Sequence, residues 1–156
     1  MEELAVKNIG SETTKQYIVV NIGNEQYGIN INYVDNIVRM QKITRVPKAQ
    51  EFFTGVINLR GEIIPVMSLR KKFELEDDQF TNDSRIIIVK MEQQGMVGMI
   101  VDSVKEVVTL DEADVEKANV GMTEVDKAYV SAVGKIGKNL ISLLNLQAVL
   151  IEKENV

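Results

Sequence analysis

The residue types that most often carry enzymatic chemistry are missing from this sequence. It contains no His and no Cys. These absences exclude imidazole acid–base catalysis, thiol nucleophiles, thiolate metal sites and disulfides. Hydrolases of the Ser-His-Asp and Cys-His types are excluded with them. The candidates that remain are two groups of carboxylates, a glycine-containing loop, a basic triplet and one polar turn.

The carboxylates fall into two groups, one at 76–84 (EDDQFTNDS, with Asp77, Asp78 and Asp83) and one at 112–116. A calcium loop needs oxygen ligands at alternate positions around a central Gly, and 76–84 has neither the Gly nor that spacing. Catalytic carboxylates need apolar surroundings that separate their pKa values, and neither group has such neighbours. We therefore predict solvated connections, with no catalytic site and no metal site.

The loop and the triplet are both basic. Residues 134–139 (GKIGKN) lack the Gly-Lys-Ser/Thr ending of a phosphate-binding loop and predict a turn between strands. Residues 70–72 (RKK) follow an apolar run and predict a solvated turn or a local ion pair. The net charge is −5 and aromatic residues make up 5%. This composition argues against nucleic acids and anionic membranes as partners, and no cofactor is expected.

The polar turn, residues 58–61 (NLRG), lies between two very apolar runs. Gly61 can adopt a positive φ at no steric cost, which would place Arg60 at the tip or shoulder of a hairpin. An Arg there can donate several hydrogen bonds in a fixed geometry. Two interpretations stay open: an internal ion pair that holds the turn, and a contact with a partner.

The candidate residues above must be positioned by the secondary structure around them. Much of the sequence consists of short apolar runs that occur in pairs. Hydrophobic residues make up 45% of the 156 residues, enough for a packed core. Runs with period-two alternation or β-branched residues, separated by tight turns, predict β-hairpins. A short helix is expected at 147–153, and residues 74–84 predict an exposed connection. The four predicted hairpins are 17–31, 53–69, 85–101 and 129–146.

The sequence also repeats itself. A shift of 70 residues aligns Gly28 with Gly98, and a shift of 77 aligns 55–69 with 132–146 without a gap. We predict an all-β fold of two five-stranded barrels, packed as a pseudo-duplicate around a shared core, with short helices. The groove between them would suit a partner helix.

The predicted organisation is a flexible leader (1–15) and a single domain (16–156). Within the domain, the first barrel is expected at about 16–73 and the second at about 84–146. An exchange of terminal segments between the barrels is the alternative.

Three stretches carry a family resemblance: QYIVVNIGNEQYGININYVDNIVRM (16–40), ITRVPKAQEFFTGVINLRGEIIPVMSLRKKF (43–73) and MVGMIVDSVKEVVTL (96–110). They resemble the CheW-like family of bacterial chemotaxis coupling proteins. The resemblance covers about 16–151, and GVINLRGEIIPV followed by L-R-x-x-F is its most specific part.

The resemblance implies SH3-like barrels and a non-catalytic adaptor. The implied partners are the CheW-like regulatory domain of the histidine kinase CheA and the cytoplasmic hairpin tips of methyl-accepting chemotaxis receptors. The implied location is cytoplasmic, at membrane-attached receptor arrays, with no membrane insertion by the chain itself. A coupler for a non-flagellar array is an alternative within the same class.

The resemblance also implies a receptor-binding region, while the kinase-binding face stays unassigned. Three positions depart from the family pattern: Asn36 and Ser68 stand where Glu and Asp are common, and Gln50 where Pro is usual. The implied receptor-binding residues are Val34, Asn36, Ile37, Gly55, Val56, Asn58 and Arg60.

Two rival classes make different predictions. A small carboxylate enzyme needs a buried acidic pair whose pKa values are separated. A nucleic-acid binder with an SH3-like or OB-like fold needs a basic face and salt-sensitive binding.

Overall fold

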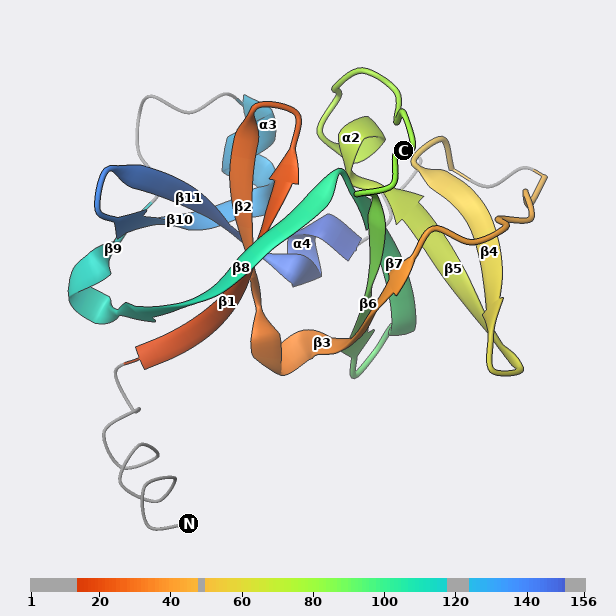
Figure 1. The fold of residues 1–156 in the computed structure, drawn as a ribbon, viewed down its shortest axis with the longest axis horizontal. Coiled ribbons are helices and arrows are strands. Elements are labelled where there is room, and N and C mark those ends of the chain that lie inside the picture. The colour runs from red at the N-terminus through yellow and green to blue at the C-terminus, as the bar shows by residue number, and fades with distance from the viewer. Residues whose placement is uncertain (1–13, 48–49, 118–123, 151–156) are drawn as a thin grey trace, which may run out of the picture.

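The described residues form two β-sheets that lie side by side along the long axis of the molecule (Figure 1). The structure is a computed structural model, and it describes residues 14–47, 50–117 and 124–150. The predicted leader lies outside them except for Thr14 and Lys15, which begin the first strand.

Each sheet combines strands from distant parts of the chain. Sheet A has the order β8-β1-β2-β11-β10-β9, and sheet B has the order β3-β6-β7-β5-β4. Sheet A contains β1 (Thr14–Ile22), β2 (Glu25–Asn30), β8 (Ser103–Asp111), β9 (Val115–Lys117), β10 (Val130–Ile136) and β11 (Asn139–Leu144). Sheet B contains β3 (Val34–Arg39), β4 (Phe53–Leu59), β5 (Glu62–Ser68), β6 (Arg85–Met91) and β7 (Gly95–Val101).

The helices are short and connect or cover the sheets. The predicted closing helix is α4, which begins one residue earlier than expected and lies between the two sheets (Figure 1). The helical elements are η2 (Ile31–Tyr33), α2 (Leu69–Lys72), η3 (Glu112–Asp114), α3 (Glu124–Tyr129) and α4 (Leu146–Leu150).

The predicted duplication is confirmed in the strand order. Five strands of sheet A, β8-β1-β2-β11-β10, correspond in order to β3-β6-β7-β5-β4 of sheet B. Each sheet has one parallel pair, which places Gly28 beside Leu143 in sheet A and Gly98 beside Val66 in sheet B. These positions are related by the shifts of 70 and 77 residues read from the sequence.

The sheets do not follow the predicted barrel ranges 16–73 and 84–146. Sheet B is built from one continuous stretch, 34–101, while β1 and β2 pair with β8 and β11 of sheet A. The three-residue η2, capped by the Asn30 side chain, follows β2, and β3 then begins in sheet B. Sheet A thus combines strands from both ends of the described chain, while sheet B is formed by its middle.

The core has three parts, of which one is shared by both sheets. Ile18 and Val20 of β1 meet Ile87 and Val89 of β6 in the shared part, together with residues of α4. Sheets A and B each have a smaller cluster of their own. Strands β1 and β6 contribute to both kinds of cluster because both of their faces are buried, which fits their unbroken apolar runs. The predicted shared core is confirmed.

Candidate functional site

All seven residues of the predicted receptor-binding region lie on sheet B or on its hairpin turn. Val34, Asn36 and Ile37 lie on β3 and the rest on β4 or the turn after it. These strands are the two edges of the sheet. The edges come together where Thr44, downstream of β3, forms an isolated antiparallel bridge with Val56.

Gly55 allows this closure. The Thr44 N–H donates to the Val56 carbonyl and the Val56 N–H donates to the Thr44 carbonyl, both at 2.8 Å. Gly55 has a φ of +154°, and a Cβ there would lie 2.2 Å from the Thr44 carbonyl oxygen. Any side chain at this position would therefore push the bridging segment away from β4.

The tip of the β4–β5 hairpin is a tight turn closed by a side-chain hydrogen bond. Arg60 and Gly61 have φ values of +53° and +84°, the geometry of a tight two-residue hairpin turn. The Asn58 Oδ1 accepts a 2.9 Å hydrogen bond from the Gly61 N–H. Arg60 is exposed, and its side chain has no hydrogen bond or ion pair with the described part of the chain. Of the two interpretations of Arg60, the internal ion pair is thus not observed there.

The three β3 residues differ in exposure. Val34 packs against the shared core, whereas the Ile37 side chain is 37% exposed. The Asn36 Oδ1 accepts a 2.9 Å hydrogen bond from the Ile37 N–H, next to an irregularity in the β3–β6 register. Asn36 therefore fixes the local strand geometry and is not hydrogen-bonded to Arg60 within the described residues.

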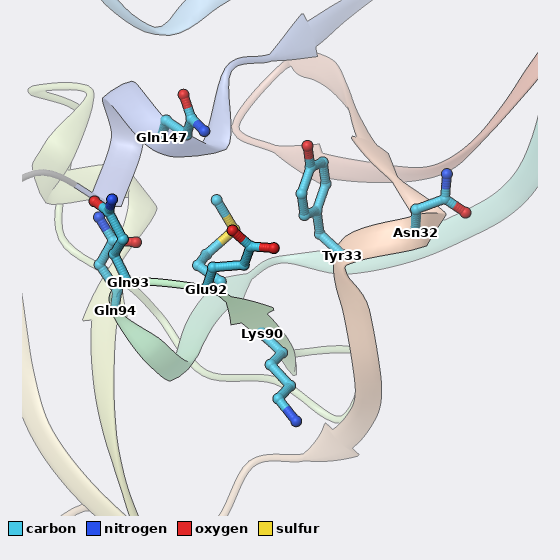
Figure 2. A pocket seen from close by; sticks show the side chains of 8 residues that line it. Asn32, Tyr33, Lys90, Glu92, Gln93, Gln94 and Gln147 are labelled. Atoms are coloured by element: carbon cyan, nitrogen blue, oxygen red, sulfur yellow. The ribbon is translucent and has the colours of Figure 1, made fainter.

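A cleft lies outside this region, and none of the seven residues lines it. It has a volume of about 690 Å³ and lies between η2, the β6–β7 turn and α4. In Figure 2 the Tyr33 ring rises on one side and Gln147 lies above, while Lys90 points away. A groove between the barrels was predicted from the sequence, but not these residues. Their only signal was the polar turn at 92–94. The cleft is lined by Asn32, Tyr33, Lys90, Met91, Glu92, Gln93, Gln94 and Gln147.

A cluster of ionisable residues lies outside both the cleft and the predicted receptor-binding region, where the loop after α2 meets the start of β8. Arg70 donates from Nε to the Asp102 Oδ1 (2.9 Å) and from Nη2 to its Oδ2 (2.5 Å). The Gly23 N–H also donates to Asp102, at 2.8 Å. The Ser68 Oγ donates to the Asp78 Oδ2 at 2.5 Å and accepts from the Lys71 N–H, which caps α2.

This cluster corrects two sequence-based expectations. Asp78 is not solvated like its neighbours, because it is half-buried and bonded to Ser68. Of the basic triplet, Arg70 forms an ion pair, and Lys72 is buried with its Nζ 3.8 Å from the Phe52 ring centroid. Only the ion pair was among the expected outcomes.

The two carboxylates have opposite pKa shifts. Burial raises the pKa of Asp78, and the hydrogen bond from Ser68 offsets only part of that effect. Burial also opposes ionisation of Asp102, but the hydrogen bonds from Arg70 and Gly23 outweigh it, so the pKa of Asp102 is lowered. A catalytic pair would show such a separation, yet both Asp102 oxygens and the Asp78 Oδ2 are used in internal contacts, and neither residue lines the cleft. The Asp78 Oδ1 is buried without a hydrogen-bond partner among the described residues. The cluster is structural.

Asp102→Asn should destabilise the protein by about 1.5 kcal/mol at neutral pH, because it removes charge-assisted hydrogen bonds in a partly buried site. The folded-state pKa of Asp102 is lowered. The stabilisation is therefore present above the ordinary aspartate pKa and is lost as the pH falls through the folded value. Urea unfolding over the acid range should show the difference from wild type shrinking. A pH-independent difference would contradict this role.

Asp78→Asn should have the opposite effect. Because the folded-state pKa of Asp78 is raised, its ionisation costs stability that is recovered only in acid, and an amide avoids that cost. We expect a gain of roughly 0.5–1 kcal/mol at neutral pH, reduced by the partial exposure of the site. The gain should vanish at low pH in the same unfolding series. A loss of stability at neutral pH would show that the carboxylate is needed in its charged form.

The described residues contain no group of three or more His, Cys, Asp or Glu side chains arranged to hold a metal ion. None of their helices is long and apolar enough to cross a membrane.

The comparisons with known proteins decide the family. The CheW-like domain family matches residues 16–154. The chain belongs to the CheW family. This match covers every strand of both sheets apart from the first two residues of β1, so the whole fold is that of a CheW-like domain.

Individual CheW relatives are similar in sequence to this chain over nearly their full lengths. Chemotaxis protein CheW of Bacillus subtilis is 34% identical, over 92% of this chain and 91% of its own length. Chemotaxis protein CheW of Klebsiella aerogenes is 29% identical, over 99% of this chain and 90% of its own length.

A solved structure agrees as well. The scaffolding protein TtCheW of Thermoanaerobacter tengcongensis is 37% identical, with a TM-score of 0.81 over 89% of this chain and 94% of its own. Membership of the CheW family supports a chemotaxis scaffold of the adaptor class.

Proposed function

We propose that this chain is a non-catalytic adaptor that couples chemoreceptor tips to the histidine kinase CheA. Family membership supports the chemotaxis setting. Ser68, Asp78, Arg70 and Asp102 form internal contacts in the cluster described above. We therefore assign the adaptor's binding role to the exposed surfaces. The adaptor would work at membrane-attached receptor arrays.

The observation that carries the proposal is the geometry of the β4–β5 turn. The tight turn leaves Arg60 exposed, without an internal ion pair among the described residues. Its guanidinium is therefore free to donate to a carboxylate or to carbonyl groups of a helical hairpin. Val56 and the exposed Ile37 would supply the apolar part of the contact, with Val34 supporting β3 from the core side.

The kinase contact would be made by a different part of the molecule. CheA carries a regulatory domain that is itself CheW-like, so this contact is expected between the ends of two barrels. Leu140, near the start of β11 on sheet A, is 61% exposed and could belong to such a surface. Its counterpart on sheet B, Ile63, pairs with Asn58 and therefore lies within the proposed receptor-binding region. No individual kinase-binding residue is assigned.

Binding to the two partners tests the proposal. The purified chain should bind a receptor cytoplasmic fragment and the regulatory domain of CheA, each alone and both together, in pull-down and co-sedimentation. Because different surfaces are used, prebound receptor fragment should not displace the kinase domain. Failure to bind either partner, or mutual displacement, would contradict the coupling role.

A further inference from the structure

The N-terminal half (14–72) and the C-terminal half (85–150) depend on each other for their sheets. Four strand pairs join the halves: β1 with β8, β2 with β11, β3 with β6, and β5 with β7. Within a half, the described strands pair only with neighbours in sequence. The shared core also draws on both halves. Neither half can bury its apolar surface alone.

The connection between the halves, residues 74–83, has no helix or strand and is exposed except for the half-buried Asp78, while Phe73 and Ser84 at its two ends are buried. One end of it is closed by a turn at 81–84, where the Thr81 N–H donates to the Ser84 Oγ and the Ser84 N–H donates to the Thr81 carbonyl.

The other end of the connection is held by a small number of hydrogen bonds to α2 and Ser68. The Leu75 N–H donates to the Arg70 carbonyl at 2.7 Å, the Arg70 Nη1 donates to the Glu76 carbonyl at 3.3 Å, and Ser68 bonds to Asp78. The loop can therefore open at small cost compared with the sheets it connects.

We propose that two copies of this chain exchange halves through this loop. In such a dimer, residues 14–72 of one copy pair with residues 85–150 of the other, and two complete globules form. Every strand pair and core contact of the monomer is kept, so only loop contacts and the entropy of association oppose exchange. The ten exposed or half-buried residues 74–83, fully extended, can span about 33 Å, enough to link neighbouring globules.

The exchanged dimer would present the proposed receptor-binding surface of sheet B twice on one particle. A bivalent adaptor can bind two receptor tips with an avidity that a monomer lacks. This inference goes beyond the coupling role and does not depend on it, because exchange is measured without either partner.

Disulfide trapping tests the exchange, since the chain has no native Cys. Asn21 on β1 and Ser103 on β8 lie directly opposite each other, with the Asn21 Nδ2 donating to the Ser103 Oγ at 2.9 Å. Directly paired antiparallel residues have Cα separations that suit a disulfide. Asn21→Cys with Ser103→Cys would form an intramolecular bond in the monomer and an intermolecular bond in the exchanged dimer.

Two further pairs locate the hinge and control for random cross-linking. Arg39 and Arg85 face each other across β3 and β6. Cysteines there become intermolecular if halves exchange, but not if only the β1–β2 hairpin exchanges through η2. Lys135 and Leu140 face each other within the β10–β11 hairpin, so cysteines there always bond within one chain.

Each variant is unfolded in urea, refolded over a range of protein concentrations, oxidised and separated on a non-reducing gel. We expect covalent dimers from the 21/103 and 39/85 pairs, with the dimer-to-monomer ratio rising roughly tenfold per tenfold increase in concentration while monomer dominates. Three results would overturn the proposal: monomers only from both pairs, dimers from the 21/103 pair alone, or equal dimer yields from the 135/140 control.

Discussion

Gly55→Ala should destabilise the protein by at least about 3 kcal/mol, by opening the edge of sheet B. The added methyl group would lie 2.2 Å from the Thr44 carbonyl oxygen and 2.7 Å from its carbon. These are backbone atoms and cannot move away as a flexible side chain could. The Thr44–Val56 bridge would be lost, and with it the link between the two edges that carry the proposed receptor-binding region. Urea unfolding followed by circular dichroism measures the effect.

Gly61→Ala is the matched control. Gly61 also has a positive φ, of +84°, but nothing lies within 4 Å of an added Cβ. Only backbone strain should appear there, about 1 kcal/mol. The difference between the two variants isolates the overlap with Thr44. Equal losses for both would mean that the bridge contributes nothing to stability.

Arg60→Ala should weaken receptor binding by about 2 kcal/mol or more, a rise in Kd of roughly 30-fold, without unfolding the protein. The guanidinium is exposed and has no ion pair in the described structure, so its removal costs no internal contact. The turn itself depends on Gly61 and Asn58 and should stay intact. Titration of a labelled receptor fragment measures the Kd, and circular dichroism measures the fold.

Lys138→Ala provides the control for charge. Lys138 is exposed in the β10–β11 turn, which corresponds to the β4–β5 turn under the 77-residue shift. Its loss changes the net charge by the same amount on an equivalent hairpin of sheet A. We expect its receptor affinity to stay near that of wild type. Equal losses for both variants would indicate general electrostatic attraction instead of a defined contact at Arg60.

Local patterns were enough to predict the fold class and the repeat. The period-two alternation in 27–31 and the β-branched run at 86–89 report on burial within each strand, and hairpin turns are short-range features. The shifts of 70 and 77 residues revealed the repeat because equivalent positions of the parallel pairs have similar surroundings. Gly28 and Gly98, for example, are both closely packed by side chains of the neighbouring strands. The predicted site residues follow one strand–turn–strand unit and β3, so the structure places them on one sheet.

Long-range features were not predictable in the same way. Which sheet β3 joins depends on the three-residue η2, whose direction is fixed by tertiary packing rather than by its own residues. Asp78 was expected in solvent because its neighbours are acidic, whereas it is drawn in by Ser68, ten positions earlier. The cleft was missed because its lining comes from three separate segments.

The rate of CheA autophosphorylation in a reconstituted mixture tests the central claim most directly. CheA, a receptor cytoplasmic fragment and this chain are combined singly, in pairs and together. A coupling adaptor predicts that kinase activity rises and responds to the receptor only when all three are present, and that Arg60→Ala lowers this response. A mixture of CheA and receptor fragment whose activity is unchanged by adding the chain would contradict the account.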